Sequence, residues 1–420
     1  MTFEDLPDGS AKVRKTASTD YGKIARAIGD IRAAGIQVSL ADINKSKFGF
    51  APDVENNRIL FGLKGILNVG DDIVDAIIAN RPYASPKDFY QKVKPGKQAM
   101  IALIKGGAFD SMEDRKFVMA WYIWETCDKK NNITLQNMAS LIKHGLLPED
   151  TEEQILARRV YEFNRYLKSV CKINAETYRL DERACNFLVE QGLESFIEDG
   201  LLMNAKKWDK QVYQNHMNVF RSWIADNKLN ILRTLNTLIF KEDWEKYAKG
   251  TISAWEMEVL CFYYHEHELA HVNEARYGFV NFYNLPEEPV VERTFPKNGK
   301  QIPIFKLSCI CGTCIAKNKT KGIVTILTNY GVVDVKYRKE YYALFDKQIS
   351  ELREDGTKKV VEKSWFNRGS MIVVMGMRSG DSFISKKYAS SGYSHQLYKI
   401  DEILPNGELV LRNERYVTNV

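Results

Sequence analysis

The sequence predicts an α+β multidomain protein that is helical over most of its length and ends in a small β-barrel. Between about residues 115 and 275, Gly and Pro are sparse and apolar residues recur at helical spacing, as in "RRVYEFNRYLKSVCKI". After residue 304 the apolar period becomes 2, in short runs separated by turn residues. A chain of 420 residues can form two or three domains, each with its own core.

Residues 1–57 are expected to form a polar tail followed by one amphipathic helix. Ile24, Ala27, Ile28 and Ile31 follow one another at helical spacing, and the helix is expected to end near residue 35. The string "IQVSLADINKS" then predicts a short strand and a turn.

The next segment, residues 58–114, begins with a helix-hairpin-helix pattern. The string "ILFGLKGILNVGDDIVDAIIANR" predicts two apolar helices joined by a hairpin that contains Asn68, Val69 and Gly70. The N–H groups of such a hairpin can bind a DNA phosphate whatever the base sequence. Asn68 stands where Gly is common and tolerates a positive φ, while Gly70 permits close approach. An ordinary αα-hairpin is the alternative, and Asp71 and Asp72 would repel a phosphate.

A second hairpin follows in "SPKDFYQKVKPGKQAMIALIKGGAFD", residues 85–110. Its first two residues, Ser and Pro, are typical of a helix start. Two such units in tandem usually form one domain that straddles a duplex backbone. Lys94, Lys97 and Lys105 are candidate phosphate contacts, although Lys is also a common solvated side chain.

A helical region is expected at residues 115–284, followed by a linker at 285–303 that contains four prolines. Residues 304–420 are expected to form the barrel. Five short strands with a helical stretch, "RKEYYALFDKQIS", between the third and the fourth are the layout of an OB barrel. Residues 301–420 hold 19 Lys and Arg against 12 Asp and Glu, which favours a polyanionic partner at this end.

The composition favours a cytoplasmic protein that does not cross a membrane. No apolar run is long enough to span a bilayer, and the first twenty residues lack the apolar segment of a secretory signal. The seven cysteines form an odd, scattered set, which favours free thiols. Cys311 and Cys314 make a lone C-x-x-C, which is best explained as buried thiols in the first barrel strand.

Several strings follow one another in a characteristic order: "GIQVSLADINKSKFGF", "NRILFGLKGILNVGDD" and "ALIKGGAFD". This order resembles the bacterial DNA polymerase III alpha subunit, a family C replicative polymerase, at the end of its fingers and its tandem helix-hairpin-helix domain. The string "EMEVLCFYYHEHEL" is similar to one that precedes the family's OB domain, with Cys261 in place of a Gly and Glu268 in place of a Pro. "TKGIVTILTNYGVVDVKYRKEYYALF" is similar to the family's second and third OB strands and the helix after them.

The resemblance implies an OB face that binds a single strand through basic and aromatic side chains. The candidates are Lys317, Lys319, Lys321, Lys336 and Tyr337. It also implies a pentapeptide that binds the sliding clamp and ends in Leu-Phe or Met-Phe. The candidate is "NTLIF", with Asn236, Leu238, Ile239 and Phe240, but an apolar helix face explains it at least as well.

The resemblance further implies a palm domain whose aspartates hold the catalytic metal ions. The sequence contains no D-x-D, so we expect no catalytic residue, cofactor or metal in this chain. The palm and its Mg²⁺ would belong to a partner chain, on which residues 20–57 would dock to complete the fingers. The expected function is to hold the primer–template duplex with the hairpins and the single-stranded template with the OB domain, as part of a DNA-directed DNA polymerase in a bacterial or phage-infected cell.

Two alternatives are open. A stand-alone, non-sequence-specific DNA-binding protein would have the same fold and no polymerase partner. A zinc-dependent hydrolase would use His267-Glu268-Leu269-Ala270-His271, which matches H-E-x-x-H, the spacing at which a helix presents two imidazoles to zinc. The spacing allows Glu274 or Glu287 as its third ligand.

Overall fold

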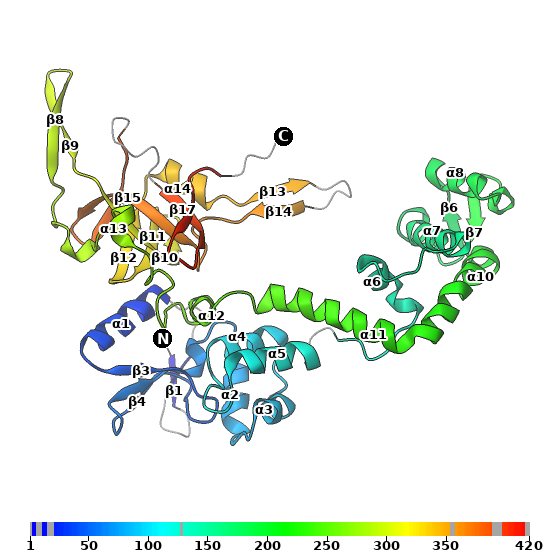
Figure 1. Ribbon diagram of the computed structural model, residues 1–420, viewed down its shortest axis with the longest axis horizontal. Coiled ribbons are helices and arrows are strands. Elements are labelled where there is room, and N and C mark those ends of the chain that lie inside the picture. The colour runs from blue at the N-terminus through cyan, green and yellow to red at the C-terminus, as the bar shows by residue number, and fades with distance from the viewer. Residues whose placement is uncertain are drawn as a thin grey trace. The chain divides into compact units, whose positions relative to one another are not determined.

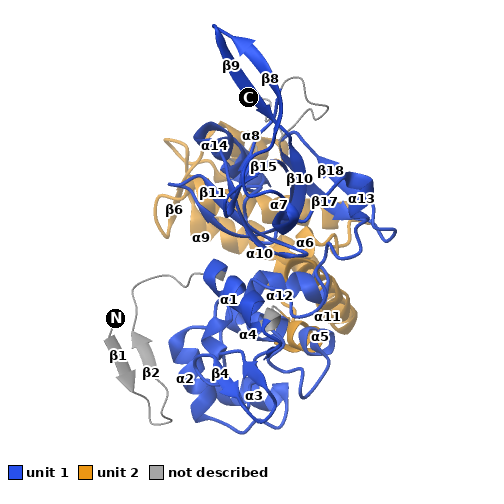
Figure 2. Ribbon diagram, turned by 90° about the vertical axis from the view of Figure 1, so that its left-hand side faces the viewer, with its two compact units in different colours: residues 1–119, 248–420 blue, residues 120–247 orange. Residues whose placement is uncertain are grey.

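The structure is a computed structural model that describes residues 2–5, 11–14, 21–126, 129–352, 358–388 and 397–415. It divides into two compact units, residues 1–119 with 248–420, and residues 120–247 (Figures 1 and 2). Each unit has a hydrophobic core of its own. The predicted α+β class is confirmed. The limits predicted for the individual domains stay predictions.

The N-terminal part of the first unit consists of short elements. They are β1 (Thr2–Asp5), β2 (Ala11–Arg14), α1 (Tyr21–Ala33), β3 (Gln37–Ser39), β4 (Ala51–Asp53), β5 (Arg58–Leu60), the 3-10 turn η1 (Leu63–Gly65), α2 (Asp71–Ala79), α3 (Pro86–Val93), α4 (Lys97–Lys105) and α5 (Arg115–Thr126), the last of which runs across the boundary between the units. Strand β5 lies between β3 and β4 in a small sheet.

The first helix of the first predicted hairpin is much shorter than expected. Residues 58–60 form strand β5, and only η1 remains helical before the hairpin. Gly62 explains the difference, because a Cβ at this position would lie 2.3 Å from the backbone carbon of Gly49. The chain is therefore extended where it passes residue 49. Within the described part of residues 58–114, it is the second predicted hairpin that has a helix on each side, α3 before it and α4 after it.

The second compact unit is almost wholly helical. Its elements are η2 (Leu135–Asn137), α6 (Met138–Lys143), α7 (Glu152–Tyr166), η3 (Leu167–Cys171), β6 (Thr177–Arg179), α8 (Glu182–Glu190), η4 (Glu194–Phe196), β7 (Leu202–Asn204), α9 (Ala205–Trp208), η5 (Asp209–Tyr213), α10 (Gln214–His216) and α11 (Asn218–Tyr247). The fully buried Trp208 lies edge-on to Phe163 of α7, with ring centroids 5.3 Å apart. Its indole N–H donates to Asn164 Oδ1, which satisfies the buried polar atoms on both sides.

The C-terminal part of the first unit contains the barrel. Its elements are α12 (Ile252–Leu260), α13 (Glu274–Tyr277), η6 (Phe282–Asn284), β8 (Val291–Lys297), β9 (Lys300–Phe305), β10 (Ser308–Asn318), β11 (Ile323–Thr328), β12 (Gly331–Lys336), α14 (Lys339–Asp346), β13 (Ile349–Leu352), β14 (Lys358–Glu362), β15 (Met371–Ser379), β16 (Ser382–Ser385), β17 (Leu397–Ile403) and β18 (Leu409–Arg412).

Five of these strands close into a barrel, as the sequence predicts. The order is β10-β11-β12-β16-β15, and β15 pairs back onto β10. All pairs are antiparallel except β12 with β16. In chain order, α14 lies between the third barrel strand, β12, and the fourth, β15. Alternate residues of β11 are buried, which is the period of 2 seen in the sequence. Gly376 allows close strand crossing, since a Cβ there would lie 2.1 Å from Ile384 O. These features are those of an OB-type barrel.

Helix α1 packs against the outside of the barrel. Ala25 belongs to a buried cluster with Ile315 of β10 and Val332 of β12. The apolar face of α1 is therefore used within this chain. Residues 20–57 were expected to dock on a partner chain. With the apolar face of α1 packed on the barrel, the part of this segment that could make such a contact is residues 34–57.

The segment predicted as a linker, residues 285–303, contains most of the β8–β9 hairpin instead of an irregular loop. The hairpin extends from the barrel as a two-stranded ribbon (Figure 1). No helix of the described ranges is both long enough and apolar enough to cross a membrane.

Candidate nucleic-acid interface

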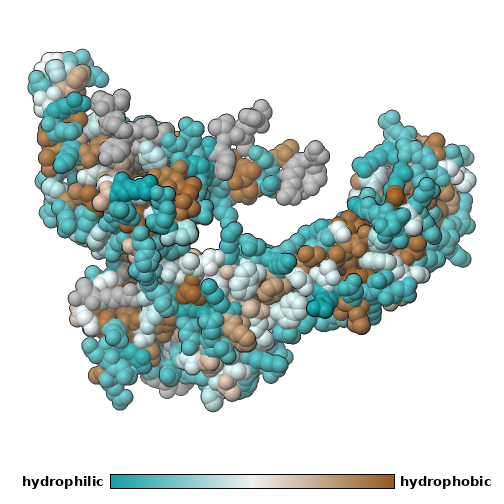
Figure 3. Space-filling view, viewed as in Figure 1, coloured by the Kyte–Doolittle hydropathy of each residue, from teal (hydrophilic) through white to brown (hydrophobic). Residues whose placement is uncertain are grey.

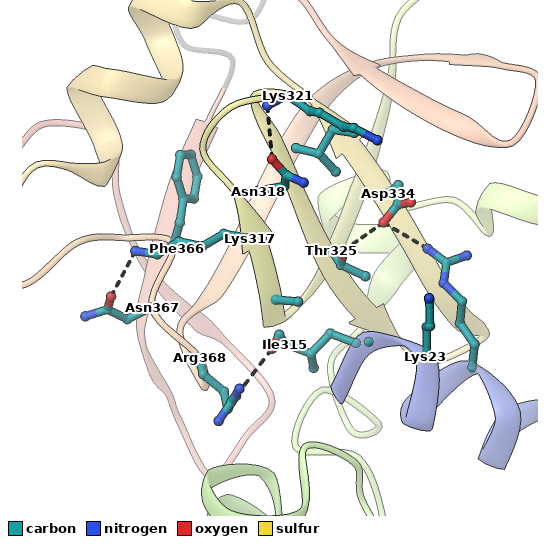
Figure 4. Close-up of a pocket in the computed structure, with 14 residues that line it drawn as sticks. Lys23, Ile315, Lys317, Asn318, Lys321, Thr325, Asp334, Phe366, Asn367 and Arg368 are labelled. Carbon is teal, nitrogen blue, oxygen red and sulfur yellow. Dashed lines mark hydrogen bonds and ion pairs between the residues drawn. The ribbon is translucent and has the colours of Figure 1, made fainter. Parts of the chain in front are cut away.

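A groove of about 950 Å³ lies on the barrel, between strands β10 to β12 and the first turns of α1 (Figure 4). Its cationic side chains are Lys23, Arg26, Lys317, Lys321 and Arg368, and its carboxylate is Asp334. The strands supply a concave wall, and α1 supplies two of the cations. A groove with this excess of positive charge suits an anionic ligand.

Ion pairs hold two of these cations in place at the edge of the groove. Lys317 Nζ lies 2.5 Å from Asp346 Oδ1 and 3.4 Å from Asn367 Oδ1. Arg26 Nη2 lies 2.8 Å from Asp334 Oδ1, which also accepts a hydrogen bond from Thr325. Both cations stay partly exposed, so the ion pairs orient them without removing them from solvent.

The first hairpin of the helix-hairpin-helix segment has the backbone that its sequence requires. Asn68 has a φ of 62°, so the predicted positive φ is confirmed. A Cβ at Gly70 would meet nothing within 4 Å, and Gly70 supplies no side chain to cap the first N–H groups of α2. The side chain of Val69 is buried, which leaves only its backbone for any ligand. The hairpin thus offers an open helix N-terminus for an anion.

Sequence reasoning missed the cation that offsets the acidic start of α2. Lys64 Nζ lies 2.6 Å from Asp71 Oδ1 and donates to Val69 O at 3.3 Å. The charge of Asp71, which would repel a phosphate, is therefore partly neutralised. Lys64 precedes Asp71 by seven residues and is separated from it by the turn. The spacing rules for neighbours on one helix therefore do not predict this pair.

The second hairpin has a well-capped first helix and a basic turn. The Ser85 hydroxyl accepts a hydrogen bond from Asp88 N, which confirms the predicted start of α3. Lys94, at the end of α3, has a φ of 49° and an exposed side chain. Gly96 precedes α4 and again supplies no side-chain cap.

The Glu256–Leu269 string fastens the helix-hairpin-helix segment to the barrel. Glu256 is fully buried, and its carboxylate accepts hydrogen bonds from Arg115 Nη1 and from the backbone N–H groups of Tyr264 and His265. The Glu258 carboxylate lies 2.5 Å from Lys105 Nζ. Both carboxylates therefore bind residues of the segment that ends at α5.

The same string contacts the barrel at its other end. The Tyr263 hydroxyl lies 3.0 Å from Thr313 Oγ1 of β10. His267 Nε2 donates to Leu327 O of β11 at 3.1 Å, and its Nδ1 accepts from Leu269 N. Burial lowers the pKa of His267 to about 4, so the ring is neutral near pH 7 and can make both hydrogen bonds.

The H-E-x-x-H pentapeptide does not form a zinc site. It lies in turns after α12, and both ring nitrogens of His267 are already bonded to backbone groups. His271 is exposed and lies 3.1 Å from Glu266. Within the ranges that the structure describes, no group of three His, Cys, Asp or Glu residues could hold a metal ion. The hydrolase alternative is therefore wrong on geometry, since it needs both imidazoles on one helix face.

The three cysteines of β10 are buried free thiols. Burial raises the pKa of Cys309 and Cys314 to about 12, so neither is a thiolate at neutral pH. This agrees with the expectation that the C-x-x-C belongs to a barrel strand.

Comparison with known proteins agrees with this architecture. Residues 35–118 match the family model described as a helix-hairpin-helix motif. A probable DNA polymerase YorL of Bacillus subtilis strain 168 is 38% identical over 424 residues, and a DNA-directed DNA polymerase of Bacillus phage SPbeta matches equally well. The alignment covers 98% of this chain but 32% of either relative. The DNA polymerase III subunit alpha of Thermus aquaticus is 38% identical over 108 residues, which is 24% of this chain and 9% of the relative.

The resemblance to DNA polymerase III alpha is confirmed.

The chain spans about a third of the length of the relatives that it matches over nearly all its residues. The structure brings Lys317 and Lys321 together in the groove, while Lys319 and Lys336 are exposed on the barrel and do not line it. Lys23, Arg26 and Arg368 line the groove and were not predicted. Lys23 and Arg26 lie three residues apart on α1, a spacing that places two cations on one face of a helix and could have been recognised in the sequence.

Two predicted DNA contacts are wrong in this geometry. Lys105 is buried and paired with Glu258, so its cation is not available to a phosphate. Tyr337 is buried in the barrel core, with its ring 5.0 Å from that of Phe366, and burial raises its pKa. Neither side chain can reach a ligand without unpacking the core.

The candidate clamp-binding residues lie in the middle of helix α11. Asn236 is buried and bonds both backbone groups of Lys130, Ile239 is buried, and Phe240 packs edge-on to Trp124. The half-buried Leu238 is on the same helix. The apolar helix face explains this stretch, and it offers no extended peptide to a clamp.

Proposed function

We propose that this chain holds DNA for a polymerase of the DNA polymerase III alpha type. The two hairpins would contact the phosphates of the primer–template duplex, through the open N-termini of α2 and α4 and through Lys94 and Lys97. The groove would contact the single-stranded template. The observation that carries the proposal is the cationic groove on an OB-type barrel in the same compact unit as two hairpins.

The chemistry of both surfaces favours binding that does not depend on base sequence. Backbone N–H groups and lysines contact phosphates, which carry no sequence information. Binding of this kind releases counterions, so the affinity falls steeply with salt. The palm aspartates and their Mg²⁺ would lie outside this chain, either in a longer polypeptide or on a separate polymerase chain.

The first test measures binding of single-stranded and primed DNA by fluorescence anisotropy over a salt series. Lys317→Ala with Lys321→Ala should reduce the slope of log K against log salt for the single strand by about 1.4, since each phosphate contact contributes about 0.7. The matched control is Lys358→Ala with Lys359→Ala, two exposed lysines of β14 outside the groove, which should leave the slope unchanged. If the unchanged chain binds no DNA even at low salt, the proposal is wrong.

Primer extension separates the polymerase role from catalysis by this chain. The purified chain alone should not extend a primer, because the D-x-D of the family's palm is absent from it. Nucleotide incorporation by the chain alone would contradict the proposal that the palm lies elsewhere. A stand-alone DNA-binding protein would bind DNA but capture no palm-bearing chain in a pull-down.

A further inference from the structure

The β8–β9 ribbon has a regular register that ends in a two-residue turn. Lys297 pairs with Lys300 across the turn residues Asn298 and Gly299. These two residues have φ values of 51° and 74°, the positive pair that a type I′ turn requires. The ribbon is therefore a defined element, and its side chains can be assigned to faces.

One face of the ribbon combines cations with exposed apolar side chains. Cross-strand partners share a face, and residues two apart on a strand do too. From residue 293 onward this places Arg293 opposite Ile304, Phe295 opposite Ile302, and Lys297 opposite Lys300 on one face. Phe295 is 54% exposed and Ile302 is 42% exposed. Residues 293–306 contain no Asp or Glu, so every charged side chain on this face from residue 293 onward is a cation.

The opposite face carries Thr294, Pro296, Gln301 and Pro303, none of which is charged. In an antiparallel ribbon, hydrogen-bonded pairs alternate with non-bonded pairs, starting from the bonded pair that closes a two-residue turn. Both prolines therefore fall on non-bonded pairs, where each removes an outward N–H. Each edge of the ribbon thereby loses one outward donor and is less suited to pair with another strand. This favours recognition through the faces of the ribbon.

The base of the ribbon is fixed to the barrel. Phe305 N donates to the Tyr388 hydroxyl at 3.0 Å, which ties the ribbon to the segment after β16, while Lys306 N donates to Val290 O at 2.8 Å and closes the base of the ribbon. Arg378 of β15 donates to Leu285 O at 2.9 Å, which ties down the chain just before β8. The direction of the ribbon is thus set by the same barrel that carries the cationic groove.

We propose that this ribbon is an arm that binds double-stranded DNA. Its basic face would lie in a groove, with Arg293 and the Lys297–Lys300 pair on phosphates and with Phe295 and Ile302 against the sugars. A two-stranded ribbon fits the major groove, and four residues of strand separate the two sets of cations by about 13 Å, close to the groove's width of about 12 Å. The choice of DNA as the partner rests on the proposed function, and charge complementarity supports it.

The test compares two sets of substitutions on the full chain. Arg293→Ala with Lys297→Ala and Lys300→Ala removes the cations, while Thr294→Ala with Gln301→Ala changes the other face of the same ribbon. For a blunt duplex, the first set should reduce the slope of log K against log salt by about 2.7, since each contact contributes about 0.9. The second set should leave that slope unchanged, and binding of the isolated single strand should change with neither set.

A separate readout does not depend on loss of binding. A Phe295→Trp variant should change its tryptophan emission when duplex is added, against a background of the unchanged chain.

Equal duplex binding by the chain with and without the three cations would overturn the arm while leaving the proposed function intact. Competition by polyglutamate as effective as by duplex would also overturn it and would indicate an acidic protein partner. If the unchanged chain binds no DNA of any form, the proposed function and the arm fail together.

Discussion

At the scale of single residues, Glu256 joins the helix-hairpin-helix segment to the string that precedes the barrel. It is fully buried, and its carboxylate faces the buried guanidinium of Arg115 and two backbone donors. Removing one partner of a buried ion pair leaves an uncompensated charge, which is costly.

We therefore predict that Glu256→Ala destabilises the first unit by about 3 to 5 kcal/mol. Urea denaturation of the full chain, followed by signals assigned to the first unit, measures this free energy. Glu266→Ala is the matched control, because Glu266 pairs with the exposed His271 and should cost less than about 1 kcal/mol. Equal effects of the two changes would contradict the anchoring role of Glu256.

His267 predicts a pH dependence with a defined sign. Its pKa is about 4 in the folded chain and about 6.5 when unfolded, so the unfolded state takes up the proton first as the pH falls. The contribution of neutral His267 to the free energy of unfolding is complete above about pH 6.5. It is lost as the pH falls to about 4, and the loss amounts to roughly 3 kcal/mol at most. A His267→Gln variant should lack this part of the pH profile of the unfolding free energy. Direct NMR titration that gave His267 an ordinary pKa would refute the prediction.

Residue-level prediction from sequence succeeded where the cause was local. The positive φ of Asn68 follows from its place in a tight hairpin, so its neighbours were enough to predict it. Lys105 failed because its partner Glu258 is 153 residues away in the chain. A distant partner that buries a lysine leaves no trace in the residues around it.

At the scale of elements, the Asn68 hairpin can be tested through its backbone. Asn68→Gly should keep the hairpin, while Asn68→Val should destabilise it by about 1 to 2 kcal/mol, because a β-branched residue is strained at positive φ. Duplex affinity should fall with the valine variant and not with the glycine variant. Thermal denaturation and anisotropy together check both parts, and an unaltered valine variant would speak against the positive-φ turn.

The sequence predicted elements correctly where apolar residues recur with a clear period. It predicted them poorly where a glycine or a proline is compatible with two different structures. Alternating burial made β11 readable, and the helix after the third strand followed from its spacing. Gly62 lies against the backbone of Gly49, which is a tertiary contact, and only the short turn η1 after it is helical. Pro296 and Pro303 suggested a linker, yet they occupy ribbon positions where a missing N–H costs nothing.

At the scale of the whole molecule, the two units with separate cores predict separate unfolding. Leu188→Ala, in the second unit, and Val335→Ala, in the first, each remove fully buried apolar volume. Leu188→Ala should cost about 2 to 5 kcal/mol and should lower only one of two calorimetric transitions. Val335→Ala should lower the other. A single transition lowered by both changes would show that the units unfold together.

The family resemblance was readable over the helix-hairpin-helix segment, the string from Glu256 and part of the barrel. It was not readable over about residues 115–250, although the alignments that cover 98% of this chain include most of this stretch. A helical unit held by apolar packing can be built from many sequences, so its pattern predicts helices without predicting a family.

The string that joins the hairpins to the barrel has a kinetic consequence for the proposed function. Because Glu256, Glu258 and Tyr263 fix the hairpins and the groove within one compact unit, DNA released from one of the proposed surfaces would stay at high effective concentration near the other. Rebinding then competes with escape, and avidity can exceed either affinity by about 10²- to 10⁴-fold. Weakening this joint would therefore shorten the residence time on primed DNA even where every phosphate contact is kept.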